Sequence, residues 1–377
     1  MQDLHLQHAH YMQLAIDLAQ RGLYTTSPNP RVGCVLVKNA EIIGQGYHVR
    51  AGEGHAEVNA IADAGGPSQT EGATAYVTLE PCSHTGKTPP CCDVLIAAKV
   101  ASVVIAMTDP NPLVAGRGIA ALEAAGITVQ TGVLEAAAQA LNPGFIKRME
   151  LGLPWVRVKL AMSMDGRTAM ASGESQWITG ADARSDVQRL RARSCAIVSG
   201  VDTVMMDDAS LTVRADELGI DPDLALLAAE KQPLRVVLDS QWRLSPDAKI
   251  LRQPGKTLVV VAVEDSSAQE ALEQAGAEVI VLAGANERVD LQGLLKALAE
   301  RECNEVMVEA GATLAGAFAQ AGLVDQYHIY MAPTFLGSEA RPLLQWPLDT
   351  MAQQQRLTID AMTPVGDDWR IDARPAR

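Results

Sequence analysis

The chain has 377 residues, of which 48% are hydrophobic and 20% are charged, and its formal net charge is −14. This length indicates two domains, each with its own core. Both halves are acidic overall and neither carries the basic patch typical of nucleic-acid binding, so we expect a small-molecule substrate. No apolar run is long enough to cross a membrane, and the first residues lack the features of a signal peptide. We therefore expect a cytoplasmic protein whose six cysteines are thiols or metal ligands.

Helices and strands alternate in the first half. A surface helix is expected up to about Gly22, followed by a hairpin whose two strands are separated at Asn39. The later helices read HAEVNAIADAGG, PCCDVLIAAK, GRGIAALEAAG and VLEAAAQALNPGF. The strands between them read ATAYVTLE, VASVVIAM and ITVQTG. This order predicts a three-layer α/β unit with a largely parallel sheet.

The stretch NPGFIKRMELGLP, rich in proline and glycine, is the predicted domain boundary, which assigns residues 1–147 to a first domain and 148–377 to a second. The second domain again alternates, with predicted helices ADARSDVQRLRAR and LQGLLKALAE. Its predicted strands are WVRVKLAM, CAIVSG, LRVVLD, TLVVVAV, EVIVLAG, EVMVEA and QYHIYMA. Residues 208–232 interrupt the pattern and are expected to form a loop that could cover a site.

A possible metal site stands in the first half. His55 and Glu57 lie in GHAEVNA, and three cysteines, at positions 82, 91 and 92, lie in EPCSHTGKTPPCCD. A catalytic zinc needs three protein ligands and an open position for a water molecule, while a carboxylate that is not a ligand moves the proton. Zinc deaminases that act on nucleobases combine His-x-Glu with Pro-Cys-x-x-Cys. The first cysteine fits this pattern, but the second thiol lies further along the chain, and helical geometry alone does not choose between the neighbouring pair.

The histidines and cysteines could also have purely structural roles. A structural zinc would need a fourth protein ligand, which His84 or Cys92 could supply. Cys34 and Cys195 stand in apolar stretches and are expected to be core residues.

The second half contains VEAGATLAGAF, a strand, a turn at Gly311 and a helix. Such a turn presents backbone N–H groups to an anion at the helix N-terminus. No Gly-x-Gly-x-x-Gly follows the first strand of this half, so a Rossmann site is not supported. Arg191 and Arg214 could clamp a phosphate, or each could form a surface ion pair. Trp177 could stack on a nicotinamide or ribose, although a buried core role is commoner.

Seven stretches together resemble one known family. SPNPRVGCVLV, GHAEVNAI, EPCSHTGKTPPC and DPNPLVAGRGI resemble the deaminase half of the bifunctional deaminase/reductase family of riboflavin biosynthesis. KLAMSMDGRTAMASGESQWITG, DDASLTVR and VEAGATLAGAFAQAGLVDQ resemble its reductase half. The resemblance implies a cytidine-deaminase-like three-layer α/β/α domain with one zinc ion. It also implies a dihydrofolate-reductase-like α/β domain that uses NADPH and forms a homodimer.

The resemblance also implies two reactions. The first domain would hydrolytically deaminate 2,5-diamino-6-(5-phosphoribosylamino)pyrimidin-4-one. The second would then reduce the ribosyl group to ribityl, giving 5-amino-6-(5-phosphoribitylamino)uracil. Two other functions compete with this one: a nucleic-acid base deaminase with an accessory domain, and a zinc-stabilised binding protein without chemistry.

Residue roles are implied position by position. The zinc ligands would be His55, Cys82 and Cys91, the proton shuttle would be Glu57, and Asn29 would hydrogen-bond the substrate. Lys87 stands beside the metal ligands, and we expect it to contact the substrate phosphate. The implied cofactor contacts are Ala161, Trp177, Thr203, Asp207, Ser240, Gly311, Ala312, Thr313, Leu314, Ala315, Gly316 and Ala317. The implied substrate contacts in the second domain are Ser175, Arg191, Leu211, Arg214 and Glu309. Lys159 and Asp165 could assist proton transfer.

Overall fold

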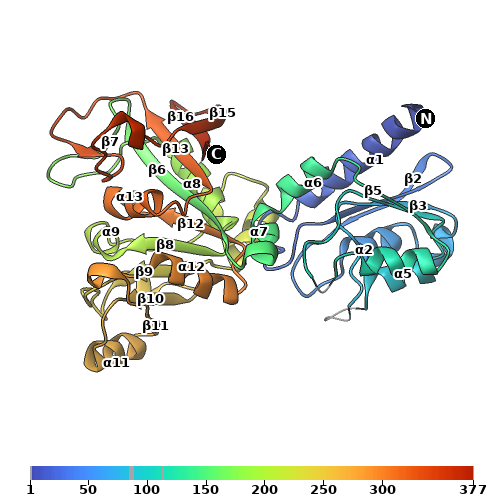
Figure 1. Ribbon diagram of the computed structural model, residues 1–377, viewed down its shortest axis with the longest axis horizontal. Coiled ribbons are helices and arrows are strands. Elements are labelled where there is room, and N and C mark those ends of the chain that lie inside the picture. Colours follow the sequence, from blue (N-terminus) through green and yellow to red (C-terminus); the bar gives the residue numbers. More distant parts are fainter. Residues whose placement is uncertain (1, 85–88, 113, 377) are drawn as a thin grey trace. The chain divides into compact units, whose positions relative to one another are not determined.

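The computed structural model describes residues 2–84, 89–112 and 114–376 (Figure 1). The chain divides into two compact units, Met1–Gly152 and Leu153–Arg377. The boundary expected after residue 147 falls within α7 (Pro143–Leu151), a helix that belongs to the first unit. No described helix is both long and apolar enough to span a bilayer.

The first unit is built on a five-stranded sheet in the order β2-β1-β3-β4-β5. The predicted hairpin is confirmed, because β1 and β2 pair antiparallel. β1 also runs antiparallel to β3, so only the β3–β4–β5 half of the sheet is parallel, rather than most of it. The strands are β1 (Gly33–Lys38), β2 (Glu41–Tyr47), β3 (Thr74–Val77), β4 (Ser102–Ile105) and β5 (Thr128–Thr131).

Helices cover both faces of this sheet, and alternate residues of β1 show how. Val35 and Val37 point into a core formed with α1, α6 and α7, whereas Cys34 and Leu36 point into a core formed with α2, α4 and α5. This alternation is the period-two pattern of a strand buried on both faces. The predicted three layers are therefore confirmed. The helices are α1 (Gln2–Gln20), α2 (Ala56–Asp63), α3 (Pro67–Thr70), α4 (Cys91–Ala97), α5 (Arg117–Ala124) and α6 (Glu135–Leu141), followed by α7.

The second unit contains a nine-stranded sheet in the order β11-β10-β9-β8-β12-β6-β13-β16-β15. The first seven strands in this order are parallel, and β16 and β15 add an antiparallel edge. The parallel strands are β6 (Trp155–Ser163), β8 (Ala196–Gly200), β9 (Leu234–Leu238), β10 (Thr257–Val261), β11 (Ala277–Val281), β12 (Glu305–Glu309) and β13 (Gln326–Ala332). The edge strands are β15 (Leu357–Val365) and β16 (Asp368–Pro375), and a small separate sheet pairs β7 (Arg167–Ala169) with β14 (Arg341–Pro342).

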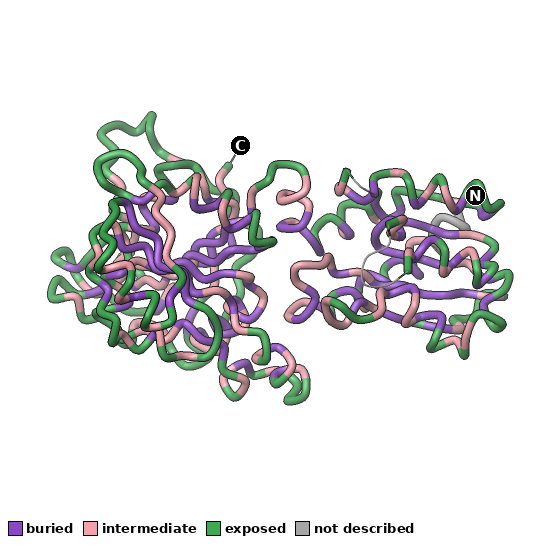
Figure 2. Tube along the Cα trace, turned by 90° about the horizontal axis from the view of Figure 1, so that it is seen from below, coloured by how far each residue is buried: buried purple, intermediate pink, exposed green. Residues whose placement is uncertain are grey.

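Helices again cover both faces, and the strands between them are buried (Figure 2). α12 and α13 pack on one face through Leu294, Leu298 and Phe318. α9 and α11 pack on the other through Val204 and Leu272. The helices are α8 (Ala181–Ala192), α9 (Val201–Met206), α10 (Pro222–Glu230), α11 (Ser266–Gln274), α12 (Leu291–Glu300) and α13 (Ala312–Gln320).

One sequence expectation for this unit needs correction, and one hairpin was missed. Residues 208–232 are not a plain loop, because they contain α10. The carboxylate of Asp221 begins that helix by accepting the N–H groups of Asp223 and Leu224, each at 3.1 Å. The hairpin of β15 and β16 was not predicted at all.

Candidate active sites

The predicted metal ligands come together in the first unit. His55 is the residue before α2, Cys91 is the first residue of α4, and Cys82 follows β3. His55 Nδ1 lies 3.3 Å from Cys91 Sγ and 3.6 Å from Cys82 Sγ. A nitrogen and a sulfur on one tetrahedral zinc ion are about 3.5 Å apart at the usual bond lengths. The three side chains therefore fit zinc without rearrangement.

A fourth protein ligand is not found among the described residues, since their metal-type cluster stops at three members. The Cys92 thiol donates instead to the carboxylate of Asp93 at 3.7 Å, and His84 is exposed. The geometry thus distinguishes Cys91 from its neighbour, which the helix pattern could not do. A set of three protein ligands matches a zinc site in which one coordination position is left for water.

The two thiols of the cluster influence each other's acidity. A hydrogen bond from the Cys91 thiol lowers the pKa of Cys82 to about 4 and raises the pKa of Cys91 far above its usual value. To hold a divalent metal, both sulfurs would bind as thiolates, so Cys91 would lose its proton on binding.

Glu57 lies in the first turn of α2, two residues after His55. Its side chain is 3% exposed, and this burial raises the pKa of the carboxyl group. His55 has an extended backbone (φ −75°, ψ 171°), so it precedes the helical geometry that would direct these two side chains apart. The side chains of His55 and Glu57 can therefore both lie at the cluster formed with Cys82 and Cys91.

Asn29 belongs to a chain of hydrogen bonds that sequence analysis did not detect. Its amide Nδ2 lies 3.1 Å from His48 Nε2, and His48 Nδ1 lies 3.1 Å from the carbonyl oxygen of Gly54. The ring of His48 lies 5.1 Å from that of His55, edge to face. Burial lowers the pKa of His48, which favours the neutral ring. No motif surrounds His48 in the sequence. Lys87, by contrast, lies outside the described residues.

The predicted cofactor contacts of the second unit lie along one edge of its sheet. Ala161 is near the end of β6, Thr203 and Asp207 follow β8, Ser240 follows β9, and Gly311 follows β12. These four strands are adjacent and parallel, so their carboxyl ends share an edge, which is where open α/β sheets bind ligands (Figure 1). The N–H of Gly311 donates to Thr203 Oγ1 at 3.3 Å.

The turn before α13 suits a phosphate group. Gly311 is exposed, and its lack of a side chain leaves the first turn of the helix uncapped. The six other predicted members of this turn, residues 312–317, form most of α13. Buried Ala315 and Gly316 pack against the protein, so only the first residues of the helix can meet a ligand. The N-terminus of α13 can therefore accept an anion such as a phosphate group.

Trp177 is 69% exposed, which excludes a buried core role. The guanidinium carbon of Arg184 lies 4.6 Å from its ring centre. Gln176 beside it hydrogen-bonds the carboxylate of Asp207, and Ser175 is half-buried. The segment that carries Ser175 and Trp177 thus reaches the same sheet edge.

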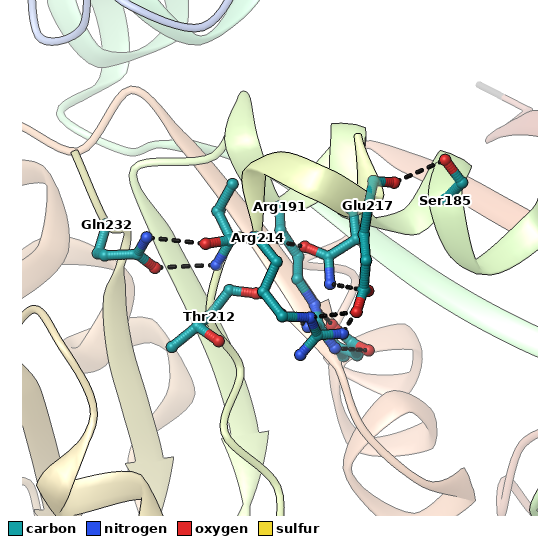
Figure 3. Close-up of polar contacts among 9 residues, drawn as sticks. Ser185, Arg191, Thr212, Arg214, Glu217 and Gln232 are labelled. Atoms are coloured by element: carbon teal, nitrogen blue, oxygen red, sulfur yellow. Dashed lines mark hydrogen bonds and ion pairs between the residues drawn. The ribbon is translucent and has the colours of Figure 1, made fainter. Parts of the chain in front are cut away.

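Charged side chains gather around Glu309, the last residue of β12. Figure 3 shows two of them, Arg191 and Arg214, with their polar contacts. Arg191 forms two hydrogen bonds with Glu309, both of 2.8 Å, and the pair is largely buried. Burial acts to raise the pKa of Glu309, but Arg191 and Lys159 outweigh it and lower that pKa to about 2. Arg214 pairs with Glu217. The guanidinium group of each arginine thus already pairs with a carboxylate. A substrate phosphate would have to bind beside that carboxylate or displace it.

The remaining predicted residues have structural partners. The side chain of Leu211 packs in the apolar core, so only its backbone can meet a substrate. The carboxylate of Asp165 accepts the N–H groups of Leu336 at 3.1 Å and Gly337 at 2.8 Å. These hydrogen bonds connect the loop after β6 to the loop after β13. Cys34 is a core residue as expected, and Cys195, half-buried just before β8, packs against the core of the second unit.

Comparisons with known proteins agree with the division of the chain into two units. Residues 6–107 match the family described as cytidine and deoxycytidylate deaminase zinc-binding region, and residues 154–370 match the RibD C-terminal domain. The riboflavin biosynthesis protein RibD of Escherichia coli is 51% identical over 366 residues, which cover 96% of this chain and 98% of that protein. The chain belongs to the RibD family.

Solved RibD structures share the whole fold. Acinetobacter baumannii RibD has a TM-score of 0.90 and 46% identity, covering 99% of this chain and 100% of that one. A Thermotoga maritima protein described as a diaminohydroxyphosphoribosylaminopyrimidine deaminase and 5-amino-6-(5-phosphoribosylamino)uracil reductase has a TM-score of 0.85 and 30% identity. It covers 99% of both chains. Both expected halves of the RibD family, the deaminase-like and the reductase domain, are thus present in one chain.

Proposed function

We propose that this chain catalyses two consecutive steps of riboflavin biosynthesis. The first unit hydrolytically deaminates 2,5-diamino-6-(5-phosphoribosylamino)pyrimidin-4-one with the help of zinc. The second unit uses NADPH to reduce the ribosyl group of the product to ribityl, giving 5-amino-6-(5-phosphoribitylamino)uracil. The observation that carries the proposal is the cluster of His55, Cys82 and Cys91 beside the buried Glu57, in a chain of the RibD family.

In the first unit His55, Cys82 and Cys91 hold the metal, which when bound supplies a water molecule of lowered pKa. The carboxylate of Glu57 accepts a proton and returns it to the departing amine, so that the leaving group is ammonia. Asn29, oriented by His48, hydrogen-bonds the pyrimidine ring. For Lys87 we propose contact with the substrate phosphate.

In the second unit the turn that begins at Gly311 binds the cofactor phosphates at the N-terminus of α13. Other cofactor contacts follow the neighbouring strands, at Ala161, Trp177, Thr203, Asp207 and Ser240. The substrate contacts are Ser175, the backbone of Leu211, Arg191, Arg214 and Glu309. Lys159, which lies in β6 beside Glu309, is close enough to this charged group to assist proton transfer.

We further propose that the chain forms a homodimer through the second unit. β15 is an edge strand of the nine-stranded sheet, and almost all of it is exposed. Leu357, Ile359 and Met362 on this strand are 42%, 57% and 51% exposed. Exposed apolar edge strands favour pairing with another chain. For the compartment we propose the cytoplasm, in keeping with six free cysteines.

The test of the two activities is product analysis by mass spectrometry. The purified chain is incubated with the diaminopyrimidine substrate, first without and then with NADPH. The expected result is the deaminated ribosyl compound alone in the first incubation and the ribityl compound in the second. An unchanged substrate in the first incubation would contradict the deaminase assignment, and a deaminated product that NADPH leaves unreduced would contradict the reductase assignment.

A further inference from the structure

One buried carboxylate in the first unit has no role in the reaction as described. Glu80 is 3% exposed and follows β3, two residues before Cys82. Its Oε1 accepts the N–H groups of Gly118 at 2.9 Å and Ile119 at 3.3 Å. Its Oε2 accepts those of Gly116 at 2.9 Å and Asp109 at 3.2 Å. A single side chain therefore satisfies four backbone donors of the segment that runs from the end of β4 into α5.

The backbone beside this carboxylate is also held closely. The N–H of Glu80 donates to the carbonyl oxygen of Met107 at 3.0 Å. A Cβ atom placed on Gly118 would lie 2.1 Å from the carbonyl oxygen of Pro81, so the start of α5 rests directly on Pro81. The carbonyl oxygen of Cys82 accepts the N–H of Cys92 at 3.2 Å. The three residues that end at Cys82 are thus fixed between α5 on one side and α4 on the other.

The position of the Cys82 sulfur depends on this packing. Cys82 lies outside any helix or strand, so regular hydrogen bonding does not fix its backbone. Its sulfur must nevertheless stay within reach of His55 Nδ1 for both to bind one ion. Hydrogen bonds between a carboxylate and backbone N–H groups are stronger than those between neutral groups. Neighbours of metal ligands typically affect metal affinity by 10–100-fold when they are changed.

We propose that Glu80 is a positioning residue of the metal site. Through its four hydrogen bonds it fixes residues 109–112 and 114–119 against Pro81, and this contact sets the position of Cys82. The inference rests on the proposed zinc deaminase function and adds to it a residue that touches neither metal nor substrate.

Two substitutions test this role in the full-length chain. Glu80→Gln keeps the shape of the side chain but turns an amide NH₂ group towards N–H donors that need an acceptor. Gly118→Ala keeps the Glu80 carboxylate but adds a Cβ atom 2.1 Å from the carbonyl oxygen of Pro81 and 3.2 Å from Glu80 Oε1, so it disturbs the same contact from the side of α5. Asp63→Asn is the matched control, since Asp63 also accepts a backbone N–H, from Gln45 at 2.8 Å, but away from the cluster. The measurements are the rate of zinc release to an excess of a chromogenic chelator and the visible spectrum of the cobalt-substituted protein.

Both test variants are expected to release zinc about 10–100-fold faster than the wild type and to show an altered cobalt spectrum. Asp63→Asn should match the wild type, and the reductase rate should be unchanged in every variant. If Glu80→Gln does not fold, as judged by circular dichroism, Gly118→Ala decides the question by the same measurements. Wild-type release rates and spectra in the folded variants would overturn the inference alone. A wild-type chain that takes up no zinc would overturn the proposed deaminase function and this inference with it.

Discussion

At the residue scale, His55 and Glu57 show how a spacing that is unsuited to a helix can form a site. Residues two apart on a regular helix point in different directions. The extended backbone of His55 removes it from the helix and leaves Glu57 in the first turn. The imidazole therefore joins Cys82 and Cys91. The buried carboxyl group of Glu57 interacts with all three of these side chains.

The role of Glu57 predicts a specific loss of function. Glu57→Gln should lower the rate of ammonia release by about 10²–10⁴-fold, because an amide cannot carry the proton. Bound zinc, measured by atomic absorption, should stay at one ion per chain, as for the wild type. Glu71→Gln serves as the control because Glu71 is an exposed residue paired with Lys99. A Glu57→Gln variant that deaminates at the wild-type rate would exclude the proton-shuttle role.

The pair of Arg191 and Glu309 predicts a pH-dependent contribution to stability. The pKa of Glu309 is lowered to about 2, so its stabilising effect is present above its unfolded pKa of about 4.3 and is lost as the pH falls from there towards 2. Arg191→Met should lower the free energy of unfolding by about 3–5 kcal/mol at neutral pH, because the buried carboxylate of Glu309 loses both of its hydrogen bonds from Arg191. Below about pH 4 the difference from the wild type should shrink as that carboxylate is protonated.

Urea unfolding followed by circular dichroism measures this effect at both pH values. The matched control is Arg374→Met, which removes an exposed pair with Asp360 and should cost less than about 1 kcal/mol. Equal losses in both variants, or a loss for Arg191→Met that does not depend on pH, would contradict the assignment.

The sequence identified part of the metal site but not its surroundings. His55, Glu57 and Cys82 were recognisable because zinc chemistry needs those residue types at short separations. His48 and Glu80 were not, because a single histidine or glutamate has no pattern until folding brings its partners near. Those partners are Asn29 for His48 and the N–H groups of the segment after β4 for Glu80.

At the element scale, apolar strands were predictable and charged ones were not. β8, β9 and β10 are mostly buried and rich in valine, isoleucine and leucine, so their sequences alone indicated them. β16 contains Arg370 and Asp372, which normally indicate an exposed loop. In the fold they pair with Asp186 and His328 on other elements. Such pairing depends on tertiary contacts that a local pattern cannot reveal.

α10 was missed although the chain carries its start signal. Asp221 caps the helix and Pro222 occupies its first turn, which is the usual order at a helix N-terminus. The lack of an apolar stripe explains the error, because the sequence ALLAA is apolar all round and gives no period.

The exposed strand β15 predicts how the proposed homodimer would be disrupted. Ile359→Asp should shift the chain from dimer to monomer, because it places a charge on the face of β15 that carries the exposed apolar side chains of Leu357 and Ile359. Thr358→Asp is the control, since neighbouring residues of a strand point to opposite faces. Sedimentation equilibrium gives the mass of each variant. A wild-type monomer, or a dimer that tolerates Ile359→Asp, would exclude this interface.

At the scale of the whole molecule, each unit has its own sheet, its own cores and its own candidate site. The division into two domains followed from length and from the change of motifs along the chain. The exact position was harder to predict: the observed division after Gly152 lies within the stretch 142–154 chosen for its proline and glycine, but residue 147 lies inside α7. Pro143 occupies the first turn of that helix and Gly152 ends it with a left-handed backbone, so both residues bound the helix rather than break it.

The independence of the two sites gives the most direct test of the account. Ammonia release from the diaminopyrimidine substrate and NADPH oxidation with the deaminated product are measured before and after zinc is removed with a chelator. We predict that the chelator abolishes ammonia release, that added zinc restores it, and that NADPH oxidation continues throughout. Ammonia release that persists in the metal-free chain would contradict the central claim that His55, Cys82 and Cys91 hold a catalytic zinc.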